Sequence, residues 1–259
     1  MQDKEMSFWD HLEVLRWSIL RVFVVLVVFL VGWFTILPSV FDQFILGPTN
    51  SRFFLYKYLS RLSGLGGFFP NFGDDVFHVD IININVTSQF MTHISTSFCL
   101  AFVSAFPYVI FEVWRFISPA LYESESIKLK RAFIAGTIMF YVGCAVGYSI
   151  VFPFTFRFLT EYQLSSSVVN QISLNSYMDN FFLLILMLGI VFELPMVIWI
   201  FSRLGLVTQI FLKKYRRHAV VLLLVLAAFI TPTGDPFTLM VVFLPLYILF
   251  EIGILLAKK

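Results

Sequence analysis

An all-α integral membrane protein with six transmembrane helices is the fold class that the sequence predicts, from its composition and from the spacing of its charges. Of the 259 residues, 59% are hydrophobic and only 13% are charged, whereas a soluble globular domain carries about 25% charged residues. Three stretches without any charged residue, 22–41, 81–111 and 132–156, each reach the roughly 20 residues that a helix needs to cross a bilayer. The chain is therefore expected to fold in lipid.

Six predicted spans follow from these stretches and from the apolar runs after them. They are expected at about 18–37, 88–112, 132–154, 178–201, 216–230 and 236–256. The last two are short apolar runs on either side of a predicted turn that contains Pro and Gly, Thr231-Pro232-Thr233-Gly234-Asp235. By themselves, these two runs are consistent with two short spans or with a re-entrant hairpin.

The connection between the first two spans, at about 38–87, is the longest in the chain. A bare connection between helices needs only about 2–8 residues, so this one is expected to have structure of its own. Within it, apolar side chains recur at helical spacing over 51–62, and Arg52, Lys57 and Arg61 fall elsewhere on the helical wheel. This pattern predicts an interfacial amphipathic helix on the outer membrane surface.

The distribution of positive charge predicts the orientation of the chain. With six spans, 14 of the 18 Lys and Arg residues fall on the side of the N-terminus: Lys4, Arg16, Arg21, Arg115, Lys128, Lys130, Arg131, Arg203, Lys213, Lys214, Arg216, Arg217, Lys258 and Lys259. Only Arg52, Lys57, Arg61 and Arg157 fall on the other side. Because loops rich in Lys and Arg stay in the cytoplasm, both termini are expected to be cytoplasmic.

Signatures of enzymes are absent from the sequence, which has no zinc-binding His-Glu-x-x-His, nucleophile elbow, phosphate-binding loop or Rossmann glycine pattern. Its four histidines are scattered over separate segments, which disfavours a shared metal site, and no local basic patch indicates nucleic-acid binding. The expected function is therefore not enzymatic and uses no cofactor, metal or nucleic acid.

After these exclusions, the acidic residues in the predicted spans are the remaining candidates for a chemical role. Glu193 lies about 15 Å from the predicted cytoplasmic end of the fourth span, where an ionised carboxylate costs roughly 2.5–3.5 kcal/mol. It is therefore a functional candidate, with a protonated, hydrogen-bonded acid as the alternative. Glu112, three residues before Arg115, is expected to be a solvated anchor at the end of its span. His93 is expected to make an interhelical hydrogen bond.

A longer motif ends the second span: Trp114-x-Phe116-x-x-Pro119-Ala120-Leu121-x-x-x-Glu125. Others precede and follow it: Phe8 with His11-Leu12-Glu13-Val14-Leu15-Arg16, then Phe192-Glu193-Leu194-Pro195, then Thr231-Pro232, Asp235, Pro245, Tyr247 and Phe250-Glu251-Ile252-Gly253. In these motifs and their order, nearly the whole chain resembles the TatC family, the receptor subunits of the twin-arginine translocase.

The resemblance implies a fold and a setting. It implies six spans with both termini cytoplasmic, in agreement with the charge distribution, and it favours two short spans for the last hairpin. It further implies a bacterial inner-membrane location, a homo-oligomeric complex, single-span TatA-like and TatB-like partners, and export driven by the proton-motive force without a cofactor. The substrates would be folded proteins whose signal peptides carry two adjacent arginines.

The resemblance also implies where those arginines bind. A carboxylate can hold a guanidinium through two parallel hydrogen bonds, which accounts for a receptor that prefers Arg to Lys. The principal contact is expected to be Glu125. The second contact is assigned to Glu13, which lies one position before the family's usual Glu, where this sequence has Val14. Glu123 is the alternative for this second contact. The other residues of this expected site are Arg16, Trp114, Phe116, Pro119 and Leu121.

A second expected site would recruit the small partners, and its residues are Glu193, Asp235 and Glu251. Leu239 stands where a polar residue is frequent in the family, so Glu193 is expected to find other partners. A hypothesis from another class is an ion-coupled secondary transporter that uses Glu193 to carry protons. Such a transporter is expected to show internal repeats, and the two halves of this chain show no convincing repeat.

Overall fold

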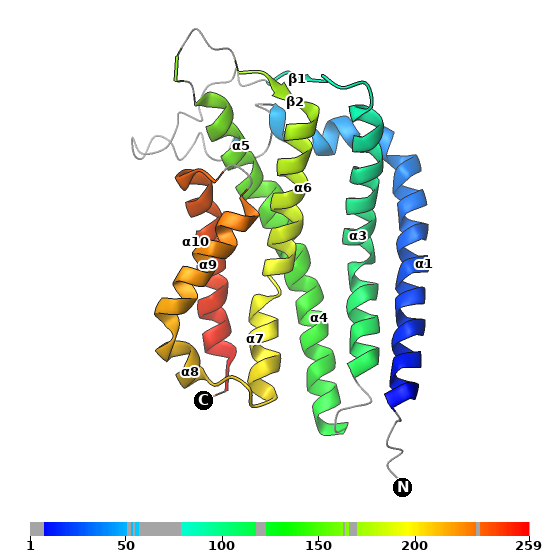
Figure 1. The fold of residues 1–259 in the computed structure, drawn as a ribbon, viewed down its shortest axis with the longest axis vertical. Helices are drawn as coiled ribbons and strands as arrows, with labels where there is room; N and C mark the ends of the chain where they lie inside the picture. The colour runs from blue at the N-terminus through cyan, green and yellow to red at the C-terminus, as the bar shows by residue number, and fades with distance from the viewer. Residues whose placement is uncertain are drawn as a thin grey trace.

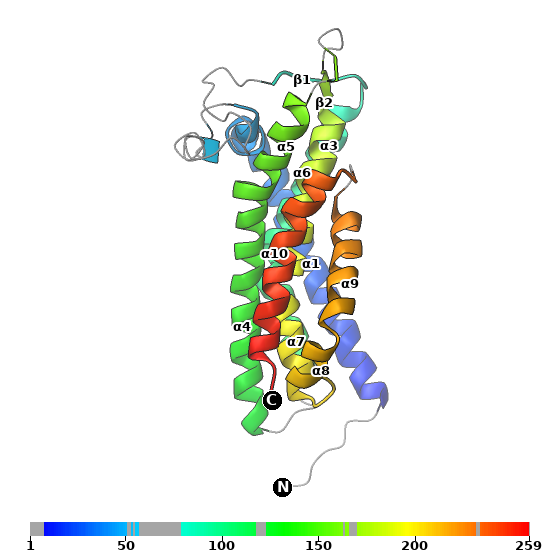
Figure 2. The same ribbon diagram turned by 90° about the vertical axis from the view of Figure 1, so that its left-hand side faces the viewer.

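A computed structural model describes residues 8–50, 53, 55–56, 79–117, 123–162, 164–165, 170–231 and 234–258. They form a bundle of long helices that run roughly along one axis (Figure 1). Helix α1 begins and helix α10 ends at the same end of this bundle, here called the terminal end, and two short strands lie at the opposite end, here called the strand end (Figures 1 and 2). The protein is an all-α membrane protein, and five helical segments of its described part are long and apolar enough to cross a bilayer.

The first three long helices are α1 (Phe8–Val40), α3 (Ser88–Ile117) and α4 (Glu123–Val146). A π-helical turn, Gly147–Val151, joins α4 to α5 (Phe152–Glu161), so that the backbone continues as one long helix. Pro153 stands in the first turn of α5. Because proline has no N–H to donate to the preceding turn, the helical ladder changes its hydrogen-bond spacing just before this residue.

The predicted fourth span is divided into α6 (Leu174–Val191) and α7 (Leu194–Arg203). The Ser173 side chain accepts a hydrogen bond from the Ser176 N–H and caps the start of α6. Pro195 lies in the first turn of α7, where a missing N–H costs nothing, and the helix is interrupted at residues 192–193 before it. Glu193 therefore stands at a break between two helices.

The chain ends in α8 (Gln209–Lys214), α9 (Arg216–Ile230) and α10 (Pro236–Leu256). With 15 residues, α9 is about 22 Å long and shorter than the roughly 30 Å hydrocarbon core, as expected. The last helix, α10, has the predicted bounds 236–256, but with 21 residues it extends about 31 Å, so its description as a short helix is wrong. Helix α10 continues past Pro245, since within a bundle neighbouring groups can satisfy the backbone that a proline frees.

Two strands join segments that the sequence shows only as loops. β1 (Ile81–Ile82) pairs in parallel with β2 (Ile172–Ser173) at the strand end. Most of the predicted interfacial helix at 51–62 lies outside the described residues. Phe53 and Tyr56, which are described, are buried, and the Tyr56 hydroxyl donates hydrogen bonds to the carbonyls of Pro48 and Pro153. These contacts attach part of the long connection to the start of α5.

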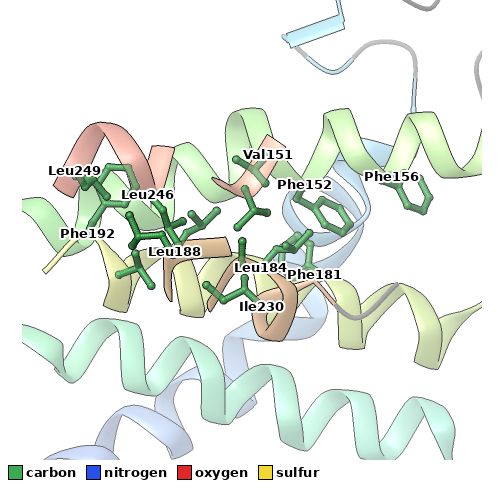
Figure 3. Close-up of a cluster of buried hydrophobic side chains, with 14 of the residues drawn as sticks. Val151, Phe152, Phe156, Phe181, Leu184, Leu188, Phe192, Ile230, Leu246 and Leu249 are labelled. Atoms are coloured by element: carbon green, nitrogen blue, oxygen red, sulfur yellow. The ribbon is translucent and has the colours of Figure 1, made fainter. Parts of the chain in front are cut away.

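The apolar core lies where α5, α6, α9 and α10 meet. Figure 3 shows side chains from these helices and from the π-helical turn pointing toward one another. Fully or almost fully buried members include Val151, Phe152, Leu184, Leu188, Ile230, Leu246 and Leu249. Since lipid provides no hydrophobic force between helices, such contacts stabilise the bundle through close packing.

A seam of glycines brings α4 close to α6. A Cβ atom added to Gly143 would lie 2.7 Å from the carbonyl oxygen of Leu188, and one added to Gly189 would lie 2.6 Å from the Sγ of Cys144. Gly147 continues the seam, 3.0 Å from the Cα of Ile185 by the same measure. Small residues at these positions allow the two backbones to pack closely, as in many membrane bundles.

Candidate functional site

The terminal end of the bundle collects the residues expected to bind a signal peptide. Glu13 and Arg16 are exposed on the first turns of α1, and Trp114 and Phe116 are half-buried near the end of α3. Glu125 belongs to the first turn of α4, of which the structure describes the backbone and not this side chain. Pro119 and Leu121 lie outside the described residues. The three helix ends lie at one end of the bundle (Figure 1).

Trp114 is the best-defined aromatic side chain at this end. Its ring has the Nζ of Lys130, on α4, 5.7 Å from its centroid, a cation–π distance. The Trp114 Nε1–H is buried and has no hydrogen-bond partner among the described residues. Buried tryptophans usually satisfy this donor, so Trp114 is an exception among the described residues.

An ion pair deeper in the same region was not anticipated. The carboxylate of Glu112, on α3, accepts hydrogen bonds from Arg21 of α1, at 2.9 Å from Nε to Oε1 and 3.0 Å from Nη2 to Oε2. The hydroxyl of Tyr108 donates to the same Oε1 at 3.0 Å, and Arg21 also donates to the Ser18 hydroxyl at 3.2 Å. The carboxylate thus binds the guanidinium in a bidentate manner, through two hydrogen bonds.

The expectation that Glu112 is a solvated anchor is therefore wrong. Its side chain is only 2% exposed, and its main partner is 91 residues away in the sequence. Arg115, the partner expected three residues on, stands farther off, with Nη1 at 3.7 Å from Oε1. Arg21 and Glu112 border the uncharged stretches 22–41 and 81–111, so a comparison of the charges at the ends of these stretches could have suggested their pairing.

The rest of the interface between α1 and α3 is also joined by polar contacts. The Nε2–H of His93 donates to the carbonyl of Phe34 at 2.8 Å, and the two rings are stacked with centroids 4.0 Å apart. The expected interhelical hydrogen bond of His93 is thus confirmed. The Nε1–H of Trp33 donates to the hydroxyl of Ser104 at 2.8 Å. These contacts connect α1 to α3 at several depths.

Glu193 presents the opposite situation. Both of its carboxylate oxygens are buried, and neither has a hydrogen-bond partner among the described residues. Its side chain lies against α4, where a Cβ atom added to Gly136 would be 2.6 Å from Oε2. The hydrogen bond from a neighbouring helix that the sequence analysis considered is thus not found in the described part of the chain. The absence of a side chain at Gly136 makes the space in which this acid fits.

Asp235 and Glu251 do not share a site. Asp235 caps the start of α10, where its Oδ1 accepts a hydrogen bond from the Thr238 N–H at 2.7 Å. Glu251 lies 16 residues later, or about 24 Å along the helix, and its Oε2 accepts a hydrogen bond from Arg216 of α9 at 2.7 Å. The residues expected to recruit partners therefore do not form one site. Glu193 is the one of the three that has no hydrogen-bond partner on either carboxylate oxygen among the described residues.

Comparison with known proteins gives a consistent family. The family model described as Sec-independent protein translocase protein (TatC) matches residues 10–245. The TatC protein of Blattabacterium sp. subsp. Periplaneta americana is 32% identical over 98% of this chain and 95% of its own length. The TatCy protein of Bacillus subtilis is 30% identical over 100% of this chain and 91% of its own length.

The fold agrees with that of a solved relative. A crystal structure of the twin-arginine translocase receptor TatC in DDM superposes with a TM-score of 0.76, at 24% identity, covering 96% of this chain and 100% of that one. The family model covers nearly all of the chain, and the relatives match it end to end. The chain therefore belongs to the TatC family and is a membrane-embedded subunit of the Sec-independent protein translocase.

Proposed function

We propose that this chain is the receptor subunit that binds twin-arginine signal peptides of folded proteins at its terminal end, with that end in the cytoplasm. The observation that carries the proposal is the convergence of three helix ends. The start of α1 carries Glu13 and Arg16, the end of α3 carries Trp114 and Phe116, and the start of α4 carries Glu125. Acidic and aromatic residues are what a peptide with two adjacent arginines requires.

Energetics favour a site in which acids stand beside aromatic rings. A fully exposed ion pair contributes only about 0–1 kcal/mol, which is too little to separate Arg from Lys. Half-buried rings at Trp114 and Phe116 would exclude water from a bound guanidinium. The Arg21–Glu112 pair supports the chemistry, because a carboxylate on this half of α3 already holds a guanidinium through two bonds.

Peptide binding to the purified protein in lipid nanodiscs tests the proposal. A twin-arginine peptide should bind more tightly than its twin-lysine version, and Glu125→Ala should remove most of that preference. Asp42→Asn is the matched control, because it removes one exposed acid near the strand end. Equal binding of the two peptides, or equal effects of the two variants, would rule out Glu125 as an arginine contact. Glu13→Gln and Glu123→Gln then decide which acid is the second contact.

We further propose that Glu193 recruits single-span TatA-like or TatB-like partners, which together with this chain drive export with the proton-motive force. The support is its pair of buried oxygens without partners in the described chain, because a polar side chain on a partner helix could donate to them. Glu193→Ala should weaken recruitment or transport and leave signal-peptide binding largely intact. Loss of peptide binding with recruitment preserved would contradict this division of roles.

The break between α6 and α7 favours the second hypothesis, an ion-coupled secondary transporter. The interruption between α6 and α7 places Glu193 at a discontinuous helix, a feature of the binding sites of secondary transporters. Vesicles that contain this protein alone should show no proton uptake beyond that of empty vesicles if the receptor proposal is right. Uptake that disappears in Glu193→Gln would support the transporter instead.

A further inference from the structure

A pocket of about 470 Å³ lies between α4, α7 and α10, near the terminal end. Its walls are almost entirely apolar, with Ala135 and Met139 from α4, Met196 and Trp199 from α7, and Ile252 and Leu256 from α10. These helices run side by side in both views (Figures 1 and 2). All three belong to segments that are apolar enough to cross a membrane. Since Ala135, Ile252 and Leu256 are exposed, the pocket opens on the outer surface of the bundle, toward the bilayer.

Positive charge marks one end of this pocket. Arg203, the last residue of α7, lines the pocket, and its Cζ lies 5.4 Å from the ring centroid of Trp199. The backbone N–H of Lys258 donates to the hydroxyl of Ser202 at 2.7 Å, which places a second cationic residue beside the last turn of α7. No carboxylate of the described chain forms an ion pair with Arg203. The cavity is therefore apolar along its length and cationic at its mouth.

The dimensions decide what kind of molecule fits. From Pro195 to Arg203 the pocket follows nine residues of α7, a rise of about 12 Å. This length corresponds to about two turns of a helix, whereas a partner helix that crosses the membrane is about 30 Å long, so the pocket is too short to hold such a helix along its length. A soluble anion would leave the apolar walls unfilled. A flexible hydrocarbon chain with an anionic group at one end matches both the length and the charge.

We propose that this pocket binds one acyl chain of an anionic phospholipid and that Arg203 holds the lipid phosphate. Basic pockets between helices on the cytoplasmic side are known to bind anionic headgroups, and each Arg or Lys near the surface contributes to that attraction. Trp199 keeps the guanidinium at the level of the interface, since tryptophan rings favour that depth. The inference concerns the lipid-facing side of the bundle and does not depend on signal-peptide binding.

Native mass spectrometry of the purified protein, released from mixed micelles of phosphatidylglycerol and phosphatidylcholine with matched chains, tests the proposal. We expect one retained phosphatidylglycerol per protein chain and no preference for phosphatidylcholine. Arg203→Gln should lower the retention of phosphatidylglycerol about fivefold. Arg217→Gln is the matched control, because Arg217 is exposed on α9 and does not line the pocket.

A second pair of variants tests the cavity itself. Ala135→Phe should fill the pocket and abolish retention, whereas Ile134→Phe, at an exposed neighbouring position of α4, should leave retention unchanged. Equal retention of the two lipids, equal effects of Arg203→Gln and Arg217→Gln, or unchanged retention in Ala135→Phe would each overturn the proposal. A protein dimer without lipid that dissociates in Ala135→Phe would assign the pocket to a second copy of the chain and would also overturn it.

Discussion

Two helix pairs in this bundle are joined in opposite ways. Helices α1 and α3 meet through side-chain hydrogen bonds and an ion pair, from Trp33–Ser104 to Arg21–Glu112. Helices α4 and α6 meet through the glycine seam of Gly143, Gly147 and Gly189, where backbone and side chains are in direct contact. Because lipid tails are as apolar as the helices, close packing and hydrogen bonds are the two means by which helices associate in a membrane. This protein uses one for each pair.

The two interfaces also differ in how the acidic side chain at each of them is hydrogen-bonded. Glu112, between α1 and α3, has a complete set of partners, while Glu193, against α4, has none among the described residues. A carboxylate that already holds a guanidinium contributes to the association of its own helices. One with unused acceptors can contribute to the association of another molecule, and this contrast separates a structural acid from a functional candidate.

The largest effect is expected where packing alone joins the helices. Gly143→Val should destabilise the protein by about 3 kcal/mol, because its side chain would overlap the Leu188 carbonyl and Phe192. Unfolding by denaturant in detergent micelles measures the loss. Gly32→Val is the control, since a Cβ atom there meets nothing within 4 Å, and its stability should stay close to that of the parent protein. Equal losses for both variants would show that helix propensity, and not the seam, is responsible.

A smaller effect is expected at the ion pair. Glu112→Ala removes the carboxylate that Arg21 contacts through two hydrogen bonds. It should lower the midpoint of denaturant unfolding by less than Gly143→Val does, because the Arg21 side chain that is left behind is 34% exposed. Removing one member of a pair leaves the other without a partner, which costs more than the pair itself contributes. Glu112→Gln, which can still accept from Arg21 and Tyr108, should recover most of the loss. Indistinguishable midpoints for Glu112→Ala and the parent protein would remove this pair from the interactions that stabilise the α1–α3 interface.

A single neutral hydrogen bond between the same helices should contribute still less. Trp33→Phe removes the donor to the Ser104 hydroxyl and keeps most of the aromatic surface. Interhelical hydrogen bonds in membranes average about 0.6 kcal/mol, so the expected loss is of that size. Ser104→Ala should have a similar effect in the same unfolding assay. If the double variant loses as much as the two single variants together, the two groups do not interact.

The smallest effect on stability is expected at Glu193. Glu193→Gln keeps the size of the side chain and removes the ionisable group, and no described residue would lose a hydrogen bond. Stability should therefore stay the same or rise slightly, because burying an ionisable carboxylate without partners is at least as costly as burying a neutral amide of the same size. The unfolding assay in detergent checks this without any partner protein. A clear loss of stability would mean that Glu193 is a structural acid like Glu112, and the contrast between the two regions would fail.

Fold class, the apolar segments and the family motifs could be predicted because they depend on local patterns. An uncharged stretch such as 81–111 has one stable solution in lipid, which is a helix with all its backbone hydrogen bonds made internally. The environment of each acid could not be predicted in the same way. Glu112 and Glu193 both lie in apolar sequence, and only the packing of α3 on α1 and of the α6–α7 break on α4 determines their surroundings.

By itself, the sequence determined that this chain is helical, lies in a membrane and carries the motifs of the TatC family. The tertiary structure decided which polar groups find partners, which helix ends gather at the terminal end, and where an apolar pocket meets Arg203. The physical reason is the range of the interactions. Hydrophobicity and backbone hydrogen bonding act within a segment, whereas the partner of a side chain such as Arg21 can be 91 residues away.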